Sequence, residues 1–393
     1  MMKRNTLIIC ILCMALLLSG CTDGGTNEGP NTSTPASSDG KKDNERQCNL
    51  DVLQPAAYGN VEGLNLKPGS YISLIGRNSD DEFWKMIKAG AKQAIDDINT
   101  MLGYEGNDMV TLTYSAPSTP DSIDEQVNIL DEELARYPTA IGIAIVDSSA
   151  CEVQFDLVAE NDIPLVAFES GSDYEGIQAM ISTNNTEAAQ TAATKLCDAI
   201  EDSGDILLFV HDTASSSGSE REQAFLNEIS TRHPDVQVAD VFHMDNLLLV
   251  KQEMIAESNT STPPESVDLN PLAPEDITDQ EALNYIINKY PDVKGCVTTD
   301  ARTTQELLKV VREAQIDDLQ IVGFEGGSKQ LDALEAGELT GLVIQNPYGM
   351  GYATVIAAAR AALGMGNEAS VDCGYIWVTK DNMENESIKR MLF

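Results

Sequence analysis

From Tyr71 onward, short apolar runs alternate with longer amphipathic segments. Apolar runs of this length, separated by segments with helical periodicity, are typical of buried parallel strands in repeated βαβ units. The pattern therefore predicts an α/β fold with parallel sheets flanked by helices. The expected strands are YISLI (71–75), AIGIAIV (140–146), PLVAF (164–168), AMIST (179–183), DILLFV (205–210), GCVTT (295–299), QIVGF (320–324) and TGLVIQ (340–345).

The first expected helix follows RNSDD (77–81) directly. Ser79 and Glu82 have the spacing of a capping box, which predicts the start of the helix. Its buried stripe is formed by residues at helical intervals, namely Trp84, Ile87, Ala91, Ala94, Ile95 and Ile98. Since Trp84 belongs to that stripe, we expect its neighbour Phe83 to be the aromatic residue that faces a cleft.

Two segments depart from the alternating pattern. Residues 21–69 are rich in Gly, Asn, Thr, Ser, Pro and charge, a composition that buries too little apolar surface to offset chain ordering. They are predicted to be a flexible tether. Residues 257–279 contain four prolines and many acids without periodicity, which predicts an inserted acidic surface loop.

The first twenty residues have the organisation of a secretory signal peptide. Lys3 and Arg4 precede the apolar run LIICILCMALLL, which is too short to span a bilayer comfortably. The following LSGC resembles the lipobox of bacterial lipoproteins, so we expect a signal peptide over 1–20 and a lipid on Cys21. The protein would then be anchored on the extracytoplasmic face of the cell membrane. The alternative is an uncleaved anchor with an incidental cysteine.

Five cysteines remain after Cys21, and neither a CxxC pair nor a cysteine–histidine spacing suggests a metal site. Cys197 and Cys296 lie among apolar residues and are expected to be buried. One disulfide, for instance between Cys48 and Cys151, is compatible with the odd number of thiols.

The charge of the chain restricts its partners. Aspartate and glutamate number 63 against 25 lysines and arginines, for a formal net charge of −38. Such a surface repels nucleic acid and anionic lipid headgroups and also other copies of the chain. We therefore expect a monomer that does not bind nucleic acid.

Polar residues end nearly every expected strand, and in open α/β sheets ligands bind beyond the carboxyl ends of the strands. A polar residue at any one strand end is commonly just solvated. Together with Phe83 and Trp84, however, these residues predict a ring of donors and acceptors beside an aromatic wall. The strand-end residues are Arg77, Asn78, Asp147, Glu169, His211, Asp212, Asp300, Glu325, Gln345 and Asn346.

Catalytic motifs are weak. The segment GFEGGSK (323–329) lacks the spacing of a phosphate-binding P-loop, and the chain contains no GxSxG elbow. The three histidines show no partner pattern, and no spacing selects a pair of carboxylates for glycoside cleavage. We therefore expect a binding protein without a cofactor, and an extracellular carbohydrate-active enzyme is a remote alternative.

Ordered motifs from Tyr71 to Trp377 resemble the ribose- and galactose-type periplasmic sugar-binding proteins of ABC transporters, whose fold is shared with the lactose-repressor family. A repressor role is contradicted by the signal peptide and by the absence of a basic helix-turn-helix segment. The motifs are DDEFWKMIKAGAKQAID, ENDIPLVAFES, STNNTEAAQTAA, GSEREQAFLNEI, YPDVKGCVTTDARTTQELLKVV, IVGFEGG, ALEAGELTGLVIQNPYGMGYATV and the closing strand GYIWVTKDN.

The resemblance implies two lobes, each a parallel sheet flanked by helices, with the ligand between them. The N-terminal lobe would comprise 70–183 plus 346–372, and the C-terminal lobe 184–345 plus 373–393. The chain would cross between the lobes near 183–184, 345–346 and 372–373, forming a three-crossing hinge.

The resemblance also implies sugar-binding roles for residues that the pattern selects. Phe83 and Trp84 stand where paired aromatics hold a sugar ring, whereas Ser170 replaces an arginine of the ribose-type proteins, which argues against ribose itself. Asp81 and Asp300 stand where the family has asparagine, and Glu169 and Glu325 stand where it has aspartate. The implied ligand-binding set is Arg77, Asp81, Phe83, Trp84, Glu169, Arg221, Asp300, Glu325 and Gln345.

The implied function is that of a lipid-anchored solute-binding protein, which delivers a monosaccharide or related small polar ligand to an ABC transporter permease. The same fold serves sensor and chemotaxis systems, so a receptor role is an alternative. In the expected pocket, four acids stand against two arginines, which leaves room for a cationic ligand such as an amino sugar.

Overall fold

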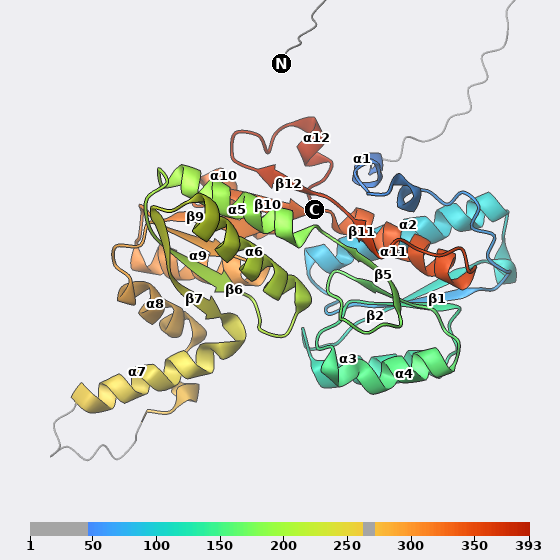
Figure 1. Cartoon of the computed structure of the whole chain (residues 1–393), viewed down its shortest axis with the longest axis horizontal. Coiled ribbons are helices and arrows are strands. Elements are labelled where there is room, and N and C mark those ends of the chain that lie inside the picture. Colours follow the sequence, from blue (N-terminus) through green and yellow to red (C-terminus); the bar gives the residue numbers. More distant parts are fainter. Residues whose placement is uncertain (1–45, 262–271) are drawn as a thin grey trace, which may run out of the picture. The chain divides into compact units, whose positions relative to one another are not determined.

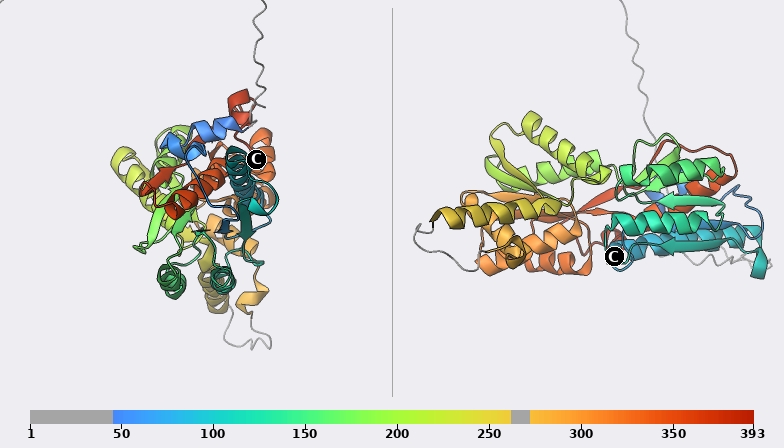
Figure 2. Two further views of the ribbon diagram at one scale, coloured as in Figure 1. Left: turned by 90° about the vertical axis from the view of Figure 1, so that its right-hand side faces the viewer. Right: turned by 90° about the horizontal axis from the view of Figure 1, so that it is seen from below.

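A computed structural model describes residues 46–261 and 272–393, which form two lobes, each built on a six-stranded sheet (Figures 1 and 2). In the first sheet the strand order is β11-β5-β4-β3-β1-β2, and all neighbours are parallel. Its strands are β1 (Tyr71–Ile75), β2 (Thr111–Ser115), β3 (Ala140–Ile143), β4 (Leu165–Phe168), β5 (Ile177–Ser182) and β11 (Ser370–Asp372).

The second sheet has the order β12-β10-β9-β8-β6-β7. Its neighbours are parallel except for β12, which pairs antiparallel with β10, so the expectation of a wholly parallel sheet is wrong at this edge. The two-lobed α/β class is confirmed. The strands are β6 (Gly204–Val210), β7 (Val236–His243), β8 (Gly295–Thr298), β9 (Gln320–Phe324), β10 (Gly341–Gln345) and β12 (Tyr375–Val378).

Helices cover both faces of the first sheet. One face packs against α2 (Glu82–Leu102) and α11 (Pro347–Ala362), and the other against α3 (Ile123–Leu134) and α4 (Glu152–Glu160). The α2–α11 pair is close because both helices carry glycine at the crossing. A Cβ at Gly90 would lie 1.9 Å from the carbonyl oxygen of Tyr348.

The second sheet is covered in the same way. On one face lie α5 (Asn185–Ala199) and α6 (Ser216–Arg232), and on the other α7 (Leu247–Ser261), α8 (Asp279–Lys289), α9 (Ala301–Ala314) and α10 (Ser328–Ala336). Short helices α1 (Gln47–Asp51) and α12 (Glu386–Lys389) lie outside these layers. Within the described ranges, none of the helices has the length and apolar character needed to cross a bilayer.

Three connections between the sheets are joined to one another by hydrogen bonds. They follow β5, β10 and β11. The hydroxyl of Thr183 donates to Oε1 of Gln345 at 2.6 Å, and the amide of Asn346 donates to the carbonyl oxygen of Cys373 at 2.8 Å. The backbone N–H of Asn184 donates to Asp372 at 3.2 Å. These bonds lie at the three positions where hinge crossings are expected.

Several local expectations are wrong. Helix α2 is capped by Asp81, whose carboxylate accepts from the backbone N–H of Trp84, rather than by a box of Ser79 and Glu82. Strands β2, β7 and β11 were not predicted, because their half-buried residues do not form continuous apolar runs. In the segment 257–279, residues 257–261 complete α7 and Asp279 begins α8, while 262–271 lie outside the described residues.

The predicted tether is wrong for residues 46–69. Leu53 and Tyr58 are fully buried against the α11 side of the first sheet, and Leu64 and Leu66 join the same core. The composition of the segment is polar overall because its few leucines are spaced among polar residues. Composition alone therefore did not indicate that they are buried. The rest of the predicted tether, the signal peptide and Cys21 lie outside the described residues.

The proposed disulfide between Cys48 and Cys151 is also wrong, because both thiols are free. Cys151 is buried against Ile141 and Phe155 in the core on the α3–α4 face, whereas Cys48 lies in α1. Cys197 and Cys296 are fully buried, as predicted.

Leu53→Ala should lower the free energy of unfolding by about 2–5 kcal/mol, because it removes a fully buried side chain and leaves a cavity. Val52→Ala is the matched control. The side chain of Val52 is 37% exposed, so the substitution should lower the free energy of unfolding by less than about 1 kcal/mol. Chemical denaturation of the two variants measures the difference. Equal, small effects would mean that this segment is a tether after all.

Candidate functional site

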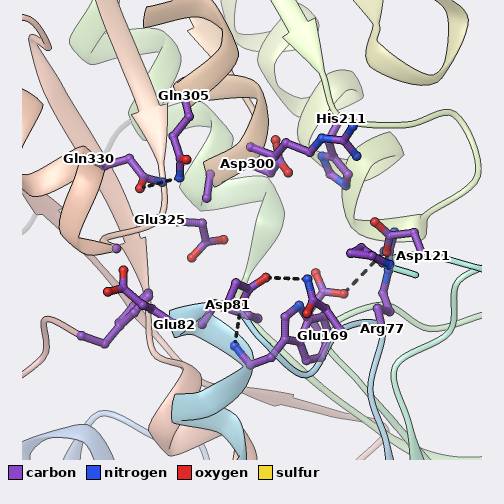
Figure 3. Close-up of a pocket in the computed structure, with 18 of the residues that line it drawn as sticks. Arg77, Asp81, Glu82, Asp121, Glu169, His211, Asp300, Gln305, Glu325 and Gln330 are labelled. Atoms are coloured by element: carbon purple, nitrogen blue, oxygen red, sulfur yellow. Dashed lines mark hydrogen bonds and ion pairs between the residues drawn. The ribbon is translucent and has the colours of Figure 1, made fainter. Parts of the chain in front are cut away.

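A cavity of about 570 Å³ lies between the carboxyl ends of the two sheets. All of the predicted ligand-binding residues line it except Gln345. Figure 3 shows Asp81, Glu169, Asp300 and Glu325 around the same space. Residues from both lobes thus meet in one hollow, as the strand-end pattern predicts.

The elements place these side chains for simple reasons. Arg77 follows β1, Glu169 follows β4 and Glu325 follows β9, so each leaves its sheet at the carboxyl edge. Asp81 and Asp300 are the N-caps of α2 and α9, and each accepts a hydrogen bond from a backbone N–H of the first turn. Each cap uses one carboxylate oxygen on its helix, and the other oxygen of Asp81 accepts from the side-chain amide of Asn78 at 3.1 Å.

Arg77 is buried and already bonded. Its Nε donates to Asp121 at 2.8 Å and Nη2 to Asp212 at 2.9 Å, while Nη1 lies 3.7 Å from Oε2 of Glu169. Burial opposes the ionisation of Asp212, but the adjacent His211 and Arg77 hold the pKa of Asp212 well below its usual range. Because Asp212 belongs to the second lobe, this ion pair joins the two lobes.

Arg221 is the buried cation on the opposite side of the cavity. Its Nε donates to Oδ1 of Asn185 at 2.9 Å and Nη1 to the carbonyl oxygen of Thr299 at 2.6 Å. The guanidinium lies 4.6 Å from the ring centroid of Phe324. Nη2 has no hydrogen-bond partner within the part of the chain that the structure describes. This nitrogen is therefore a donor that a ligand can use.

Glu169 and Glu325 are the buried carboxyl groups among the lining residues. The Oε2 atom of each is buried and lacks a hydrogen-bond partner among residues 46–261 and 272–393. Oε1 of Glu169 accepts from the hydroxyl of Ser217 at 3.2 Å, and Oε1 of Glu325 accepts from Nε2 of Gln345. Both glutamates have left-handed backbone, with φ of 62° and 74°. Strain of this kind costs about 1–3 kcal/mol and is found at functional sites.

Two of the carboxyl groups have raised pKa values. Burial raises the pKa of Glu325 to about 8, and the nearby Glu169 and Asp300 add to the effect, although Arg221 and Gln345 oppose it. Burial also raises the pKa of Asp81 to about 6, with contributions from Asp121 and Asp300. At neutral pH, Glu325 therefore holds a proton when the cavity contains no ligand.

Aromatic rings form one wall. The ring centroids of Phe83 and Trp84 are 5.4 Å apart, and those of Phe83 and Phe393 are 6.1 Å apart. All three residues line the cavity. The expectation that only Phe83 faces the cleft is therefore incomplete, because Trp84 both lines the cavity and packs against Phe168 in the core.

Gln345 is not exposed to the cavity. Its amide lies behind Glu325, between that carboxylate and the hydroxyl of Thr183. Of the other strand-end residues, Asp147 accepts a hydrogen bond from the backbone N–H of Ala150, and Asn346 belongs to the hinge. A strand-end position alone does not separate such structural roles from ligand contacts.

Other lining residues were not in the predicted set. Asp121 was missed because it lies in a loop, with φ of 60°, and Gln330 because it lies within a helix. Phe393 lies far from the motifs in sequence, and no periodic signal marks it. The unpredicted lining residues also include Glu82, Thr119, Pro120, Ala301, Arg302, Gln305 and Gly327.

The lobes contact each other beside the cavity. The backbone N–H of Gly171 donates to the hydroxyl of Ser216 at 2.9 Å, next to the Arg77–Asp212 pair. Elsewhere, the backbone N–H of Ser328 at the start of α10 donates to Glu82 at 2.6 Å. The described conformation is therefore one in which the two lobes are joined around the hollow.

One group of residues outside the cavity has side chains of the kind that bind metals. Cys197, Asp202 and His233 present ligand atoms within 4.8 Å of one another in the second lobe. Nδ1 of His233 lies 2.6 Å from Oδ1 of Asp202, and His233 is the residue that follows the last turn of α6. None of the three lines the cavity.

Two sheet-based lobes, a hinge of three connections and a shared polar cavity define a two-lobed ligand-binding protein. The family model of the periplasmic binding protein domain matches residues 72–366. The chain therefore belongs to the periplasmic binding protein family, as the sequence motifs predict.

Individual relatives are distant. The D-apiose import binding protein of Paraburkholderia graminis is 21% identical over 293 residues, which cover 74% of this chain and 78% of the relative. A carbohydrate transporter solute-binding protein of Agrobacterium radiobacter, solved with D-arabinose, is 23% identical with a TM-score of 0.65 and covers 82% of this chain and 99% of its own. An Agrobacterium vitis solute-binding protein with D-fucose is 20% identical with a TM-score of 0.67, covering 82% and 100%.

Glu325→Gln should stabilise the protein increasingly as pH rises from 5 to 8. An unfolded glutamate loses its proton near pH 4.3, whereas the folded one keeps it to about pH 8, so wild-type stability falls across this window. The neutral glutamine removes that loss. Melting temperatures of the variant and wild type at pH 5, 6.5 and 8 measure the trend.

Glu160→Gln is the control, because it makes the same substitution at a glutamate that is exposed at the end of α4. A melting-temperature difference for Glu325→Gln that does not change with pH would show that Glu325 is ionised in the folded protein across the whole range.

Proposed function

We propose that the protein is an extracytoplasmic solute-binding protein that takes a monosaccharide or related small polyhydroxyl ligand into the cavity between its lobes. The observation that carries the proposal is a set of buried polar atoms in that cavity that have no hydrogen-bond partner among the described residues. They are Oε2 of Glu169, Oε2 of Glu325 and Nη2 of Arg221. The aromatic wall lies beside them.

This combination suits a sugar. A carboxylate oxygen accepts hydrogen bonds from hydroxyl groups, and a guanidinium donates in a fixed direction. An aromatic ring covers the apolar face of a sugar ring, which the wall of Phe83, Trp84 and Phe393 supplies. A volume of about 570 Å³ lies within the usual range of small-molecule sites. An analogue lacking one hydroxyl would leave a buried carboxylate unpaired, which provides selectivity.

The relatives support the same ligand class. Their names describe D-apiose import and complexes with D-arabinose and D-fucose. All three are small sugars, and the family to which they and this chain belong is one of binding proteins. We infer that this chain binds its ligand without transforming it.

Delivery to a membrane partner completes the proposal. Ligand held between the lobes stabilises the closed arrangement, which an ABC transporter permease can distinguish from the open one. The signal-like residues 1–20 and the lipobox at Cys21 support a lipid anchor on the extracytoplasmic face of the cell membrane. The large negative charge supports a monomer at that surface.

A cognate sugar at a hundredfold excess over its dissociation constant should stabilise the protein by about 2.7 kcal/mol. A thermal-shift screen of pentoses, hexoses, polyols and nucleosides at pH 8 identifies it. Phe83→Ala should reduce the shift strongly, because it removes part of the aromatic wall. Tyr137→Ala is the matched control, since it removes an aromatic ring that is 75% exposed and outside the cavity.

Retained binding in Phe83→Ala, with a shift equal to that of Tyr137→Ala, would place the ligand elsewhere. No shift with any compound in the screen would contradict the proposed ligand class.

Cys21→Ala should move the protein from the membrane fraction to the soluble fraction, because it removes the thiol that would carry the lipid. Expression in a bacterium that processes lipoproteins, followed by fractionation and mass measurement of the N-terminal peptide, tests this. The control is Cys48→Ala, which leaves the lipobox intact. Equal membrane association of Cys21→Ala and Cys48→Ala would support an uncleaved anchor instead.

A further inference from the structure

The cavity contains more negative than positive charge. Six carboxyl groups line it, from Asp81, Glu82, Asp121, Glu169, Asp300 and Glu325, against the guanidinium groups of Arg77, Arg221 and Arg302. A polar ligand without charge would leave this excess uncompensated.

Two of the three guanidinium groups compensate little of the negative charge of Glu169 and Glu325. Arg77 forms ion pairs with Asp121, Asp212 and, at 3.7 Å, Glu169, so its single charge is shared among three carboxylates. Arg302 is exposed, so solvent and salt screen its charge. Arg221 is thus the only buried guanidinium among the lining residues that is not already paired with carboxylates.

Glu169 and Glu325 are where the missing positive charge is needed. Their side chains are 9% and 6% exposed, and both Oε2 atoms lack hydrogen-bond partners in the described residues. Burying a carboxylate without a partner is costly, and two that interact cannot both ionise easily. The two residues come from different lobes and share the same left-handed backbone, so both lobes direct an acid at the ligand.

Resting on the function proposed above, we propose that the ligand is a sugar-sized polyol carrying an ammonium group, which Glu169 and Glu325 hold between them. An ammonium group has three donors and no acceptor, so it can bond both free oxygens and still reach a third. Such charge-assisted bonds are stronger than hydroxyl contacts. The hydroxyls of the same ligand would bind Arg221, Asp300 and Asp81.

Binding of this ligand is coupled to a proton. Without ligand, Glu325 keeps its proton because burial raises its pKa to about 8. Its charged and polar neighbours are Glu169 and Asp300, which favour the proton, and Arg221 and Gln345, which oppose it. An ammonium group placed against Glu325 favours the carboxylate, so the proton leaves to solvent as the ligand enters. A neutral sugar leaves the proton in place.

Calorimetric titration at pH 6.5 tests this on the Cys21→Ala protein purified from the soluble fraction. The probes are D-glucosamine, D-galactosamine and D-mannosamine, each beside its neutral parent sugar. At this pH an amine whose pKa is near 8 is charged. We expect at least one amino sugar to bind about tenfold or more tighter than its parent. Measurements in two buffers that differ in ionisation enthalpy should show about one proton released per bound amino sugar and none for the parent.

Glu325→Gln should abolish both the proton release and the tenfold preference while keeping the acceptor that Gln345 uses. Glu169→Gln should reduce the preference but leave the proton release. Glu160→Gln, which removes an exposed charge outside the cavity, should change neither. Circular-dichroism spectra that match the wild type show that the fold of each variant is intact.

Each other outcome is decisive. Neutral sugars that bind as tightly as amino sugars, without proton release, would overturn the inferred charge and leave the sugar-binding function standing. A tighter amino sugar without proton release would overturn the role of Glu325. Failure of every amino and neutral sugar to bind, here and in the wider screen, would overturn the proposed function itself.

Discussion

The site depends on the burial of two glutamates at strand ends, each with one oxygen that has no hydrogen-bond partner among the described residues. Glu169 and Glu325 emerge from the carboxyl edges of β4 and β9, where parallel strands bring side chains from both lobes to one hollow. Their left-handed backbone is a local strain, and their desolvation is a second cost. Protonation of Glu325 lowers its desolvation cost in the empty cavity, while the backbone strain remains.

This constraint explains why the hinge and the cavity are physically connected. The hydroxyl of Thr183 donates to Gln345, and the amide of Gln345 donates in turn to Glu325. The hydrogen bonds therefore run from the connection after β5, through the connection after β10, to Glu325 in the cavity. A hydrogen bond to an ionised acceptor is stronger than one to a neutral acceptor. Any ligand that ionises Glu325 thus also strengthens the contact with the hinge residue.

Much of the fold was accessible from the sequence because buried parallel strands are continuous apolar runs, and those runs were all found. The strands that were missed, β2, β7 and β11, lie at sheet edges or near them and are only half-buried, so their residues alternate in polarity or are too few. The folded segment 46–69 was missed for a related reason. Buried leucines such as Leu64 and Leu66 are flanked by glycine, asparagine and lysine, so the composition of the segment stays polar.

The site was predictable to the extent that strand ends define it. The strand-end rule places Arg77, Glu169 and Glu325 correctly at the cavity. It could not distinguish a side chain that is available to a ligand from one that is already bonded to other residues. Arg77 has the chemistry of a ligand donor, yet its nitrogens are engaged by Asp121 and Asp212. The reverse holds for Phe393, which reaches the aromatic wall through the tertiary fold alone.

The ion pair of Arg77 with Asp212 in the second lobe affects how charge in the cavity is balanced. Its bond to Asp212 uses the only buried cation of the first lobe among the lining residues to join the lobes. Glu169, on the same lobe, is left with a guanidinium at 3.7 Å and the hydroxyl of Ser217 as its contacts. In this conformation Arg77 shares its one charge among Asp121, Asp212 and Glu169. Arg221 is the other buried guanidinium among the lining residues, so a ligand that brings its own positive charge is the one that balances Glu169 and Glu325.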